Sequence, residues 1–174
     1  MKKLHPDYQF VIPAAPNLET NAFSEMVTHN SLLVTHNSIK ALLAADSAVI
    51  ASGTSTLQAA MLKVPMVVIY KLSPITFFVG RFIVKVKYIS LANILLDYLP
   101  SDYASPLRIK ELLQGEASRE NIIMELTRIS ADQSYKDEMV SQLGKATLLF
   151  MDKEASLRVA GMVEELGAKG CRNA

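Results

Sequence analysis

The stretch that decides the fold is Val49-Ile50-Ala51-Ser52-Gly53-Thr54-Ser55-Thr56-Leu57-Gln58-Ala59-Ala60. It begins as a short apolar strand, passes through a small polar turn and continues as a helix. The first N–H groups of a helix have no partner inside it, and the helix dipole places partial positive charge there. A strand that runs into such a turn is therefore a place where a phosphate or diphosphate can bind. The alternative interpretation is an ordinary helix N-cap.

The segments around this stretch alternate between short apolar runs and helical patterns. A second strand, residues 66–70, ends in Tyr70-Lys71, so its carboxyl end should meet that of the first strand at one sheet edge. Continuous apolar strands separated by helices are typical of a parallel sheet covered on both faces. Strands are expected at residues 8–12, 31–34, 47–51, 66–70 and 88–91, with helices opening at Asn17 and spanning residues 38–45 and 54–62.

The second part of the chain predicts helices rather than more sheet. A loop is expected over residues 97–106, followed by helices at residues 107–114, 119–129, about 136–150 and about 153–166, with Ser118 as an N-cap. We therefore expect an α/β part over about residues 1–115 and a helical extension over about residues 116–174, within one domain.

The composition excludes several classes of function. Eighteen Lys and Arg against seventeen Asp and Glu give a net charge of +1, which argues against nucleic-acid binding through a global positive field. The single cysteine and three scattered histidines predict neither a disulfide framework nor a metal site. No secretory signal is expected, and no uncharged run reaches the roughly 20 residues that span a bilayer.

Residues 75–87 form a strongly apolar segment that also carries basic side chains. The residues predicted to face the membrane or a lipid are Phe77, Phe78, Arg81, Phe82, Lys85 and Lys87. One interpretation is a buried helix with basic residues at one end. The other is an interfacial segment that lies on an anionic membrane or holds a lipid substrate.

Signals for a catalytic nucleophile or acid–base pair are weak. Ser52 lacks the Gly-x-Ser-x-Gly elbow, and neither Gly-x-Gly-x-x-Gly nor a Walker A lysine motif occurs. The acidic pairs Asp137-Glu138 and Glu164-Glu165 lie on amphipathic helices, where a solvated face is the simpler interpretation. Whatever this chain binds, it is expected to bind with turn backbone and hydroxyl groups.

Several short motifs follow one another along the chain. They are Asp7-Tyr-Gln-Phe-Val-Ile-Pro-Ala-Ala-Pro-Asn17, Ala51-Ser-Gly-Thr-Ser-Thr-Leu57, Val64-Pro-Met-Val-Val68, Tyr70-Lys71, Val86-Lys-Tyr-Ile-Ser-Leu91, Asn93-Ile-Leu95 and Glu111-Leu-Leu-Gln114. In this order they resemble the C-terminal, donor-binding half of the lipid-A-disaccharide synthase family, over essentially the whole chain. The order and spacing carry the resemblance, because no single motif would.

The resemblance implies a GT-B fold of two Rossmann-like domains, of which this chain would be the second. It implies a glycosyltransferase that moves 2,3-diacylglucosamine from its UDP derivative onto lipid X, giving the lipid A disaccharide 1-phosphate and UDP. The expected place is the cytoplasmic face of the Gram-negative inner membrane, with the protein peripheral to it. The transfer would invert the anomeric centre without a metal or other cofactor.

Carried over by position, the resemblance assigns the donor site to particular residues. The predicted substrate-binding residues are Ser52, Gly53, Thr54, Ser55, Thr56, Gln58, Tyr70, Lys71 and Asn93. Gln58 stands where the family usually has a glutamate that holds the ribose, so the charge is lost there. Ala92 stands where the family has proline, and residues 96–109 form a longer link than usual.

The resemblance also implies a half that this chain lacks, with the acceptor site and the catalytic base, so no base is named. The chain is then a fragment, a subunit that works with a separate N-terminal chain, or a remnant. A homodimer is the other partner considered. We expect it alone to bind UDP weakly and to transfer nothing. Two other classes stay open: another UDP-sugar GT-B enzyme, such as an epimerase or a peptidoglycan transferase, and a non-catalytic binding module.

Overall fold

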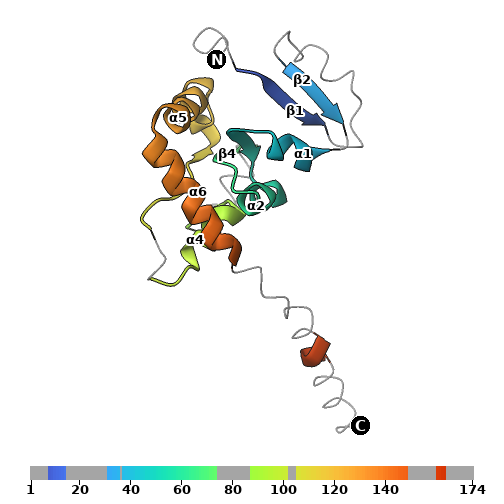
Figure 1. The fold of residues 1–174 in the computed structure, drawn as a ribbon, viewed down its shortest axis with the longest axis vertical. Coiled ribbons are helices and arrows are strands. Elements are labelled where there is room, and N and C mark those ends of the chain that lie inside the picture. Colours follow the sequence, from blue (N-terminus) through green and yellow to red (C-terminus); the bar gives the residue numbers. More distant parts are fainter. Residues whose placement is uncertain are drawn as a thin grey trace.

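A computed structural model describes residues 8–14, 31–35, 37–73, 87–101, 105–148 and 160–163. They form a mixed α/β fold in which parallel strands are flanked by helices (Figure 1). The elements in chain order are β1 (Phe10–Ala14), β2 (Ser31–Thr35), α1 (Ser38–Leu43), β3 (Ala48–Ala51), α2 (Thr54–Met61), β4 (Met66–Tyr70), α4 (Leu91–Asp97), β5 (Glu111–Leu113), the 3-10 turn η2 (Gln114–Glu116), α5 (Arg119–Ala131) and α6 (Gln133–Leu148).

The parallel pairing expected from the apolar strands is confirmed, but the described strands form two sheets. One holds β1 and β2, and the other has the order β3-β4-β5. In the second sheet Ala51 pairs with Ile69 and Tyr70 pairs with Leu113, so the carboxyl ends of its three strands lie at one edge. A cavity lined by residues of both β1 and β3 lies between the two sheets.

The core is built around β4, whose residues Met66, Val67 and Val68 are at most 1% exposed. On one face lie α2, α4 and α6, which contribute buried residues to one cluster (Figure 1). On the other face Leu126 of α5 packs against Val67. Each large apolar side chain buried in this way stabilises the fold by about 1.5–3 kcal/mol. The central strand is thus covered on both faces, as its unbroken apolar sequence predicts.

Two sequence predictions are wrong. Residues 88–91 are not a strand, because Ser90 caps α4 by accepting a hydrogen bond from the N–H of Asn93 at 3.2 Å. Residues 107–114 are not a helix, because β5 pairs with the free edge of β4. In the first case a local helix cap replaces the expected strand, and in the second a tertiary contact overrides the local helical propensity.

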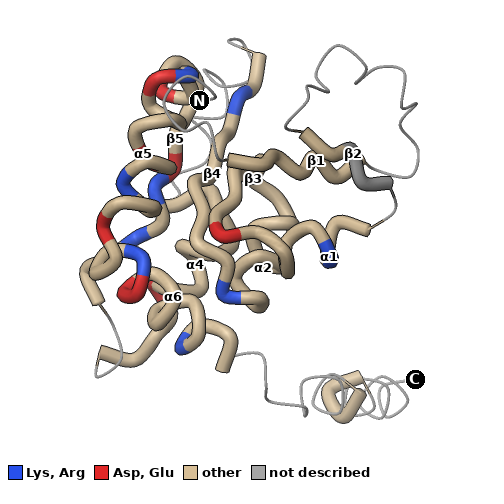
Figure 2. Tube along the Cα trace, turned by 45° about the horizontal axis from the view of Figure 1, so that its top comes forward, with Lys and Arg blue, Asp and Glu red and all other residues tan. Residues whose placement is uncertain are grey.

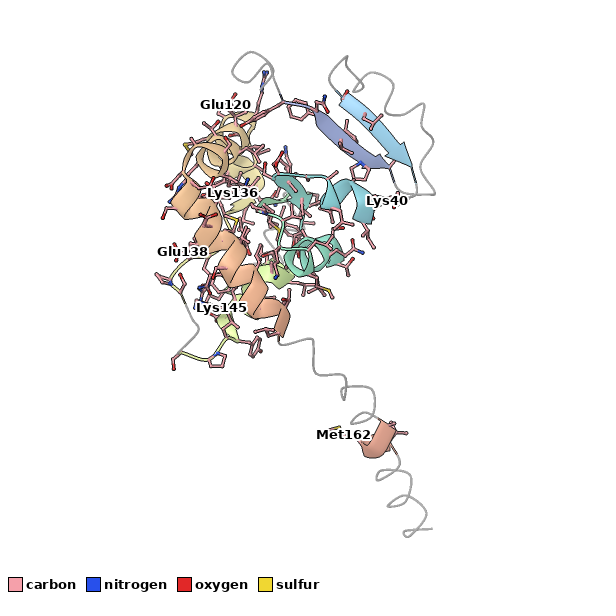
Figure 3. The ribbon with its side chains drawn as sticks, in the orientation of Figure 1. Lys40, Glu120, Lys136, Glu138, Lys145 and Met162 are labelled. Carbon is pink, nitrogen blue, oxygen red and sulfur yellow. The ribbon has the colours of Figure 1, made fainter. Side chains whose placement is uncertain are left out.

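The other helices and strands agree with the prediction apart from their ends. Pro13 lies inside β1 instead of closing it. Ser118 caps α5 as expected, with its side chain accepting from the N–H of Asn121. On α6 the charged side chains are spread along the helix, and the pair Asp137-Glu138 is exposed as expected (Figure 3). The helix predicted after Asn17 and residues 75–86 lie outside the described residues. Of the helix predicted over about residues 153–166, only residues 160–163 are described, and they are helical.

Candidate functional site

The turn after β3 is anchored by a backbone hydrogen bond to the neighbouring strand β4. The N–H of Ser52 donates to the carbonyl oxygen of Ile69 at 2.9 Å, which extends the β3–β4 ladder by one residue. Gly53 then adopts φ 156° and ψ −163°, a conformation that is essentially restricted to glycine. This glycine turns the chain so that α2 begins at Thr54.

The start of α2 leaves backbone donors exposed. Gly53, Thr54 and Ser55 are all exposed, and no side chain caps the helix. Within the described part of the chain, their three N–H groups have no hydrogen-bond acceptor. Free N–H groups at the positive end of a helix dipole are the groups that bind phosphate oxygens. This turn can therefore receive an anion without breaking an internal hydrogen bond.

Two of the hydroxyl groups predicted for this site already donate to carbonyl groups. Ser52 Oγ donates to the carbonyl oxygen of Ile89 at 3.1 Å. Thr56 Oγ1 donates to the carbonyl oxygen of Gly53 at 2.7 Å, and Thr56 is fully buried. The hydroxyls that remain open to a ligand are those of Thr54 and Ser55.

The carboxyl end of β4 continues the same edge. Tyr70 is half-buried beside Leu113, and Lys71 is exposed. The next N–H, that of Leu72, donates to Oε1 of Gln114 at 3.1 Å. The Nε2 atom of Gln114 is buried and has no hydrogen-bond partner among the described residues. The backbone of Gln114 also has a positive φ of 49°, which is uncommon for a residue other than glycine. Sequence reasoning did not name Gln114 as a site residue, because it placed Gln114 at the end of a helix and its bond to Leu72 forms only in the folded chain.

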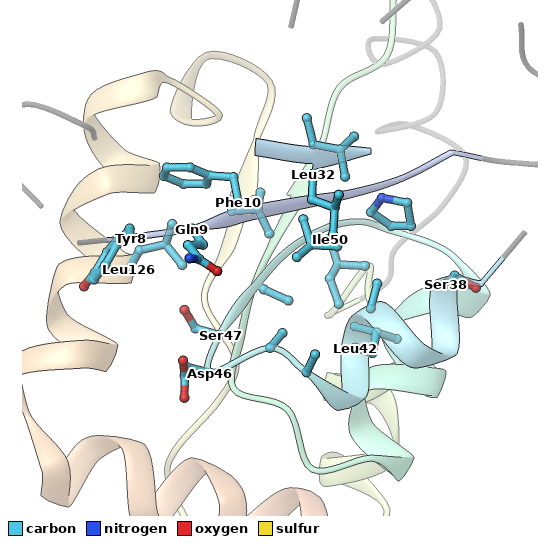
Figure 4. A pocket seen from close by; sticks show the side chains of 18 of the residues that line it. Tyr8, Gln9, Phe10, Leu32, Ser38, Leu42, Asp46, Ser47, Ile50 and Leu126 are labelled. Atoms are coloured by element: carbon cyan, nitrogen blue, oxygen red, sulfur yellow. The ribbon is translucent and has the colours of Figure 1, made fainter. Parts of the chain in front are cut away.

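A cavity of about 1210 Å³ opens beside the turn, between the two sheets. Its walls come from β1, β2, α1, β3, α5 and α6, and Ser55 and Gln58 of α2 line it as well. In Figure 4 Phe10 and Leu32 lie above Ile50 and Leu42 across this space. The cavity therefore brings two of the predicted donor-site residues to an otherwise largely apolar space.

Asn93, the last of the predicted donor-site residues, is 1% exposed and bonded at both ends of its amide. Its Nδ2 donates to the carbonyl oxygen of Ile109 at 2.8 Å, and its Oδ1 accepts from the N–H of Ile109 at 2.8 Å. Nδ2 also donates to Glu111 at 2.7 Å. The side chain thus links α4 to the segment before β5, and a direct contact with the donor stays a prediction.

The chain also contains a half-buried carboxylate that sequence reasoning missed. Glu111 opens β5 and accepts hydrogen bonds from the segment that leads into α4. The available signal was a pair of charged residues, Lys110 and Glu111, flanked by the apolar residues Ile109, Leu112 and Leu113. Its partners lie about twenty residues earlier in the chain, so only the folded structure brings them together.

Lys87 is the one member of the predicted lipid-facing set that lies within the described residues. Its Nζ pairs with Asp97 at 2.9 Å, and Arg108 pairs with the same carboxylate at 3.2 Å. The hydrogen bond to Asp97 raises the pKa of Lys87, and the hydrogen bonds from Lys87 and then Arg108 lower the pKa of Asp97. The other five members, Phe77, Phe78, Arg81, Phe82 and Lys85, lie outside the described residues, so their role is untested.

The charges of the described residues do not gather into a field of one sign. Figure 2 shows acidic and basic positions interleaved over α5 and α6. Among the described helices, none is both long and apolar enough to cross a membrane.

Comparison with known proteins identifies the family. Residues 1–161 match the family model described as lipid-A-disaccharide synthetase. The lipid-A-disaccharide synthase of Anaeromyxobacter dehalogenans (strain 2CP-1) is 36% identical over 164 residues, which cover 92% of this chain and 41% of the relative. The synthase of Geobacter sulfurreducens is 31% identical over 172 residues, 97% of this chain and 43% of the relative.

The chain therefore spans about two fifths of the length of the curated relatives that it matches. The matched region includes the turn after β3, the carboxyl end of β4 and the Glu111 to Gln114 segment. With the family model covering most of its length, the chain belongs to the lipid-A-disaccharide synthetase family, glycosyltransferases of lipid A biosynthesis.

Proposed function

We propose that this chain is the donor-binding, C-terminal half of a lipid-A-disaccharide synthase. It would hold the UDP portion of UDP-2,3-diacylglucosamine while the sugar passes to lipid X, giving the disaccharide 1-phosphate and UDP. The observation that carries the proposal is the set of free N–H groups at Gly53, Thr54 and Ser55, at the start of α2. Family membership supports UDP-2,3-diacylglucosamine as the sugar nucleotide.

The turn suits the charge that develops during transfer. As the bond between sugar and diphosphate breaks, negative charge accumulates on the departing UDP. Preorganised N–H groups and the roughly +0.5 charge at a helix N-terminus stabilise such charge without reorganising. Exposed Lys71 at the end of β4 adds a positive side chain at the same edge. The chain would thus stabilise the leaving group through these backbone and side-chain donors.

The remaining predicted residues would fix the rest of the donor. Gln58 and Ser55 line the cavity beside the turn, and an amide at position 58 can accept from or donate to a ribose hydroxyl. Thr54 and Ser55 would donate their hydroxyls to the diphosphate. Ser52, Thr56 and Asn93 would shape the site through the internal bonds they already make.

We propose that transfer also requires the further residues that the longer relatives have, supplied by a longer protein of which this chain is a piece or by a separate N-terminal chain. The acceptor site and the catalytic base would lie there, so no proton transfer is assigned to this chain. Working on lipid substrates, the protein would be peripheral to the cytoplasmic face of the inner membrane. Residues 75–87 would face the lipid.

The test is a calorimetric titration of the purified chain with UDP, followed by an assay with both lipid substrates. We expect saturable UDP binding that is lost in the double variant Ser52→Ala/Thr54→Ala, and no disaccharide. Wild-type binding that the double variant retains would contradict the roles given to the Ser52 and Thr54 side chains. Disaccharide made by the chain alone would show that no further half is needed.

A further inference from the structure

The carboxylate of Glu111 gathers four hydrogen bonds from one short segment. Oε2 accepts from the N–H of Ile89 at 2.9 Å. Oε1 accepts from the N–H of Ser90 at 3.0 Å, from Ser90 Oγ at 2.7 Å and from Asn93 Nδ2 at 2.7 Å. All four partners are donors, which suits an ionised carboxylate, because that group only accepts. An amide in the same place would turn an N–H₂ group toward at least one of these donors.

No positive side chain takes part in this arrangement. Within the described residues, the ion pairs are those of Lys87 and Arg108 with Asp97, and neither involves Glu111. The carboxylate therefore organises neutral donors: two backbone N–H groups, a hydroxyl and a side-chain amide. Hydrogen bonds to a charged acceptor are shorter and stronger than those between neutral groups.

One peptide unit connects Glu111 to the turn after β3. The peptide between Ile89 and Ser90 donates its N–H to Glu111 Oε1 and accepts from Ser52 Oγ through its carbonyl oxygen. Because a peptide unit is planar, fixing its N–H also fixes the direction of its carbonyl oxygen. Glu111 thereby determines where the Ser52 hydroxyl finds its acceptor.

Ser52 is held from two sides and leads directly into the free N–H groups. Its own N–H donates to Ile69 of β4, and its hydroxyl donates to Ile89. The next residue is Gly53, whose unusual backbone conformation sets the direction of the N–H groups of Gly53, Thr54 and Ser55. A glycine has no side chain to hold its own conformation, so the orientation of this turn depends on the anchor that precedes it.

We propose that Glu111 is a positioning residue of the donor site. It touches no ligand, and it orients the N–H groups of Gly53, Thr54 and Ser55 through the Ile89–Ser90 peptide and Ser52. The proposal rests on the proposed function for its consequence in UDP binding, but the orientation of the turn can be measured without a ligand. The competing interpretation is that Glu111 only stabilises the fold.

The test compares Glu111→Gln with Glu125→Gln in the full chain. Glu125 of α5 is a matched control, because it is a buried carboxylate that accepts a hydrogen bond from Tyr135 at 2.7 Å. In the ligand-free proteins, we expect Glu111→Gln to move the backbone amide resonances of Gly53, Thr54 and Ser55, and Glu125→Gln to leave them in place. Unchanged resonances in Glu111→Gln would overturn the proposal whether or not UDP binds.

A double-mutant cycle with UDP gives the second readout. We expect Glu111→Gln to weaken UDP binding about tenfold in the wild-type chain and by less than about twofold in a Ser52→Ala background, because coupled residues are not additive. An equal loss in both backgrounds would show that Glu111 does not act through Ser52. If wild type binds no UDP, the proposed function fails and the amide resonances still decide the role of Glu111.

Glu111→Asp keeps the experiment decisive if Glu111→Gln does not fold. The shorter acid keeps the charge but cannot reach both the Ile89 and Ser90 donors with the same geometry. We expect the same amide resonances to move, by a smaller amount. A folded Glu111→Asp chain with wild-type resonances at Gly53 to Ser55 would contradict the positioning role.

Discussion

Asn93 and Ile109 form a closed ring of two hydrogen bonds, in which the side-chain amide of one residue pairs with the backbone N–H and carbonyl of the other. Both bonds are 2.8 Å long, and Asn93 is 1% exposed. The amide thus completes the backbone pairing of the segment before β5 as a neighbouring strand would. This ring anchors α4 beside the sheet.

Replacing Asn93 with alanine should be costly, because it leaves the N–H and carbonyl of Ile109 buried without partners. We expect Asn93→Ala to lower the free energy of unfolding by about 3 kcal/mol, measured by urea denaturation. Asn121→Ala is the control, since Asn121 donates a single exposed bond to Glu116, and it should cost below about 1 kcal/mol. Equal losses in the two variants would argue against the ring.

The backbone of Gly53 should tolerate no side chain. Although a Cβ there would meet no atom within 4 Å, its φ of 156° disfavours any L residue. We expect Gly53→Ala to cost about 1–3 kcal/mol of stability and to weaken UDP binding at least about tenfold as the turn shifts. Calorimetry and thermal unfolding measure the two effects. Gly115→Ala is the control: its Cβ also meets nothing within 4 Å, and UDP affinity should be unchanged.

A stabilising substitution is available in α6. Gly144 lies inside the helix, and the nearest atom to an added Cβ is Cε of the flexible Lys63 side chain at 3.4 Å. Glycine in a helix interior costs about 0.5–1 kcal/mol relative to alanine. We expect Gly144→Ala to raise the free energy of unfolding by that amount with UDP binding intact. A loss of stability would mean that the Lys63 side chain cannot move aside.

Tyr135 should make stability fall in alkaline solution. Burial first, and then its hydrogen bond to Glu125, raises the pKa of Tyr135, while nearby Arg128 acts in the opposite direction. The folded state therefore holds this proton more tightly than the unfolded state does. The resulting stability is fully present below the unfolded pKa of about 10 and is lost as pH rises toward the folded value.

The measurement is urea denaturation of the wild type and Tyr135→Phe between about pH 8 and pH 11. The free energy of unfolding should decline more steeply above about pH 10 in the wild type than in the variant, which has no proton to lose at this position. Parallel curves would show that Tyr135 titrates as it does in the unfolded chain.

The described fold follows from sequence where local and tertiary preferences agree. The apolar run that forms β4 is buried on both faces, and Ser118 caps α5 with its own side chain. The wrong predictions arise where local and tertiary preferences disagree. Residues 111–113 become a strand only because β4 offers a free edge, and Ser90 becomes a cap only because α4 starts after it.

The sequence predicts where the candidate site lies, but it does not predict the hydrogen bonds that hold the site. The turn of small residues between a strand and a helix predicts where free N–H groups occur, and the structure has them at Gly53 to Ser55. Sequence cannot show that the hydroxyl of Ser52 is bonded to Ile89, 37 residues away. Nor can it show that Glu111 organises that segment, because the contact forms only after β5 joins the sheet.

Titration of the wild-type chain with UDP and, separately, with uridine tests the central claim most directly. If the N–H groups of the turn hold the diphosphate, UDP should bind in a 1:1 ratio with a dissociation constant below about 1 mM, and uridine at least about tenfold more weakly. UDP and uridine binding equally, or no saturable heat with UDP, would contradict the assignment of this turn as the donor diphosphate site.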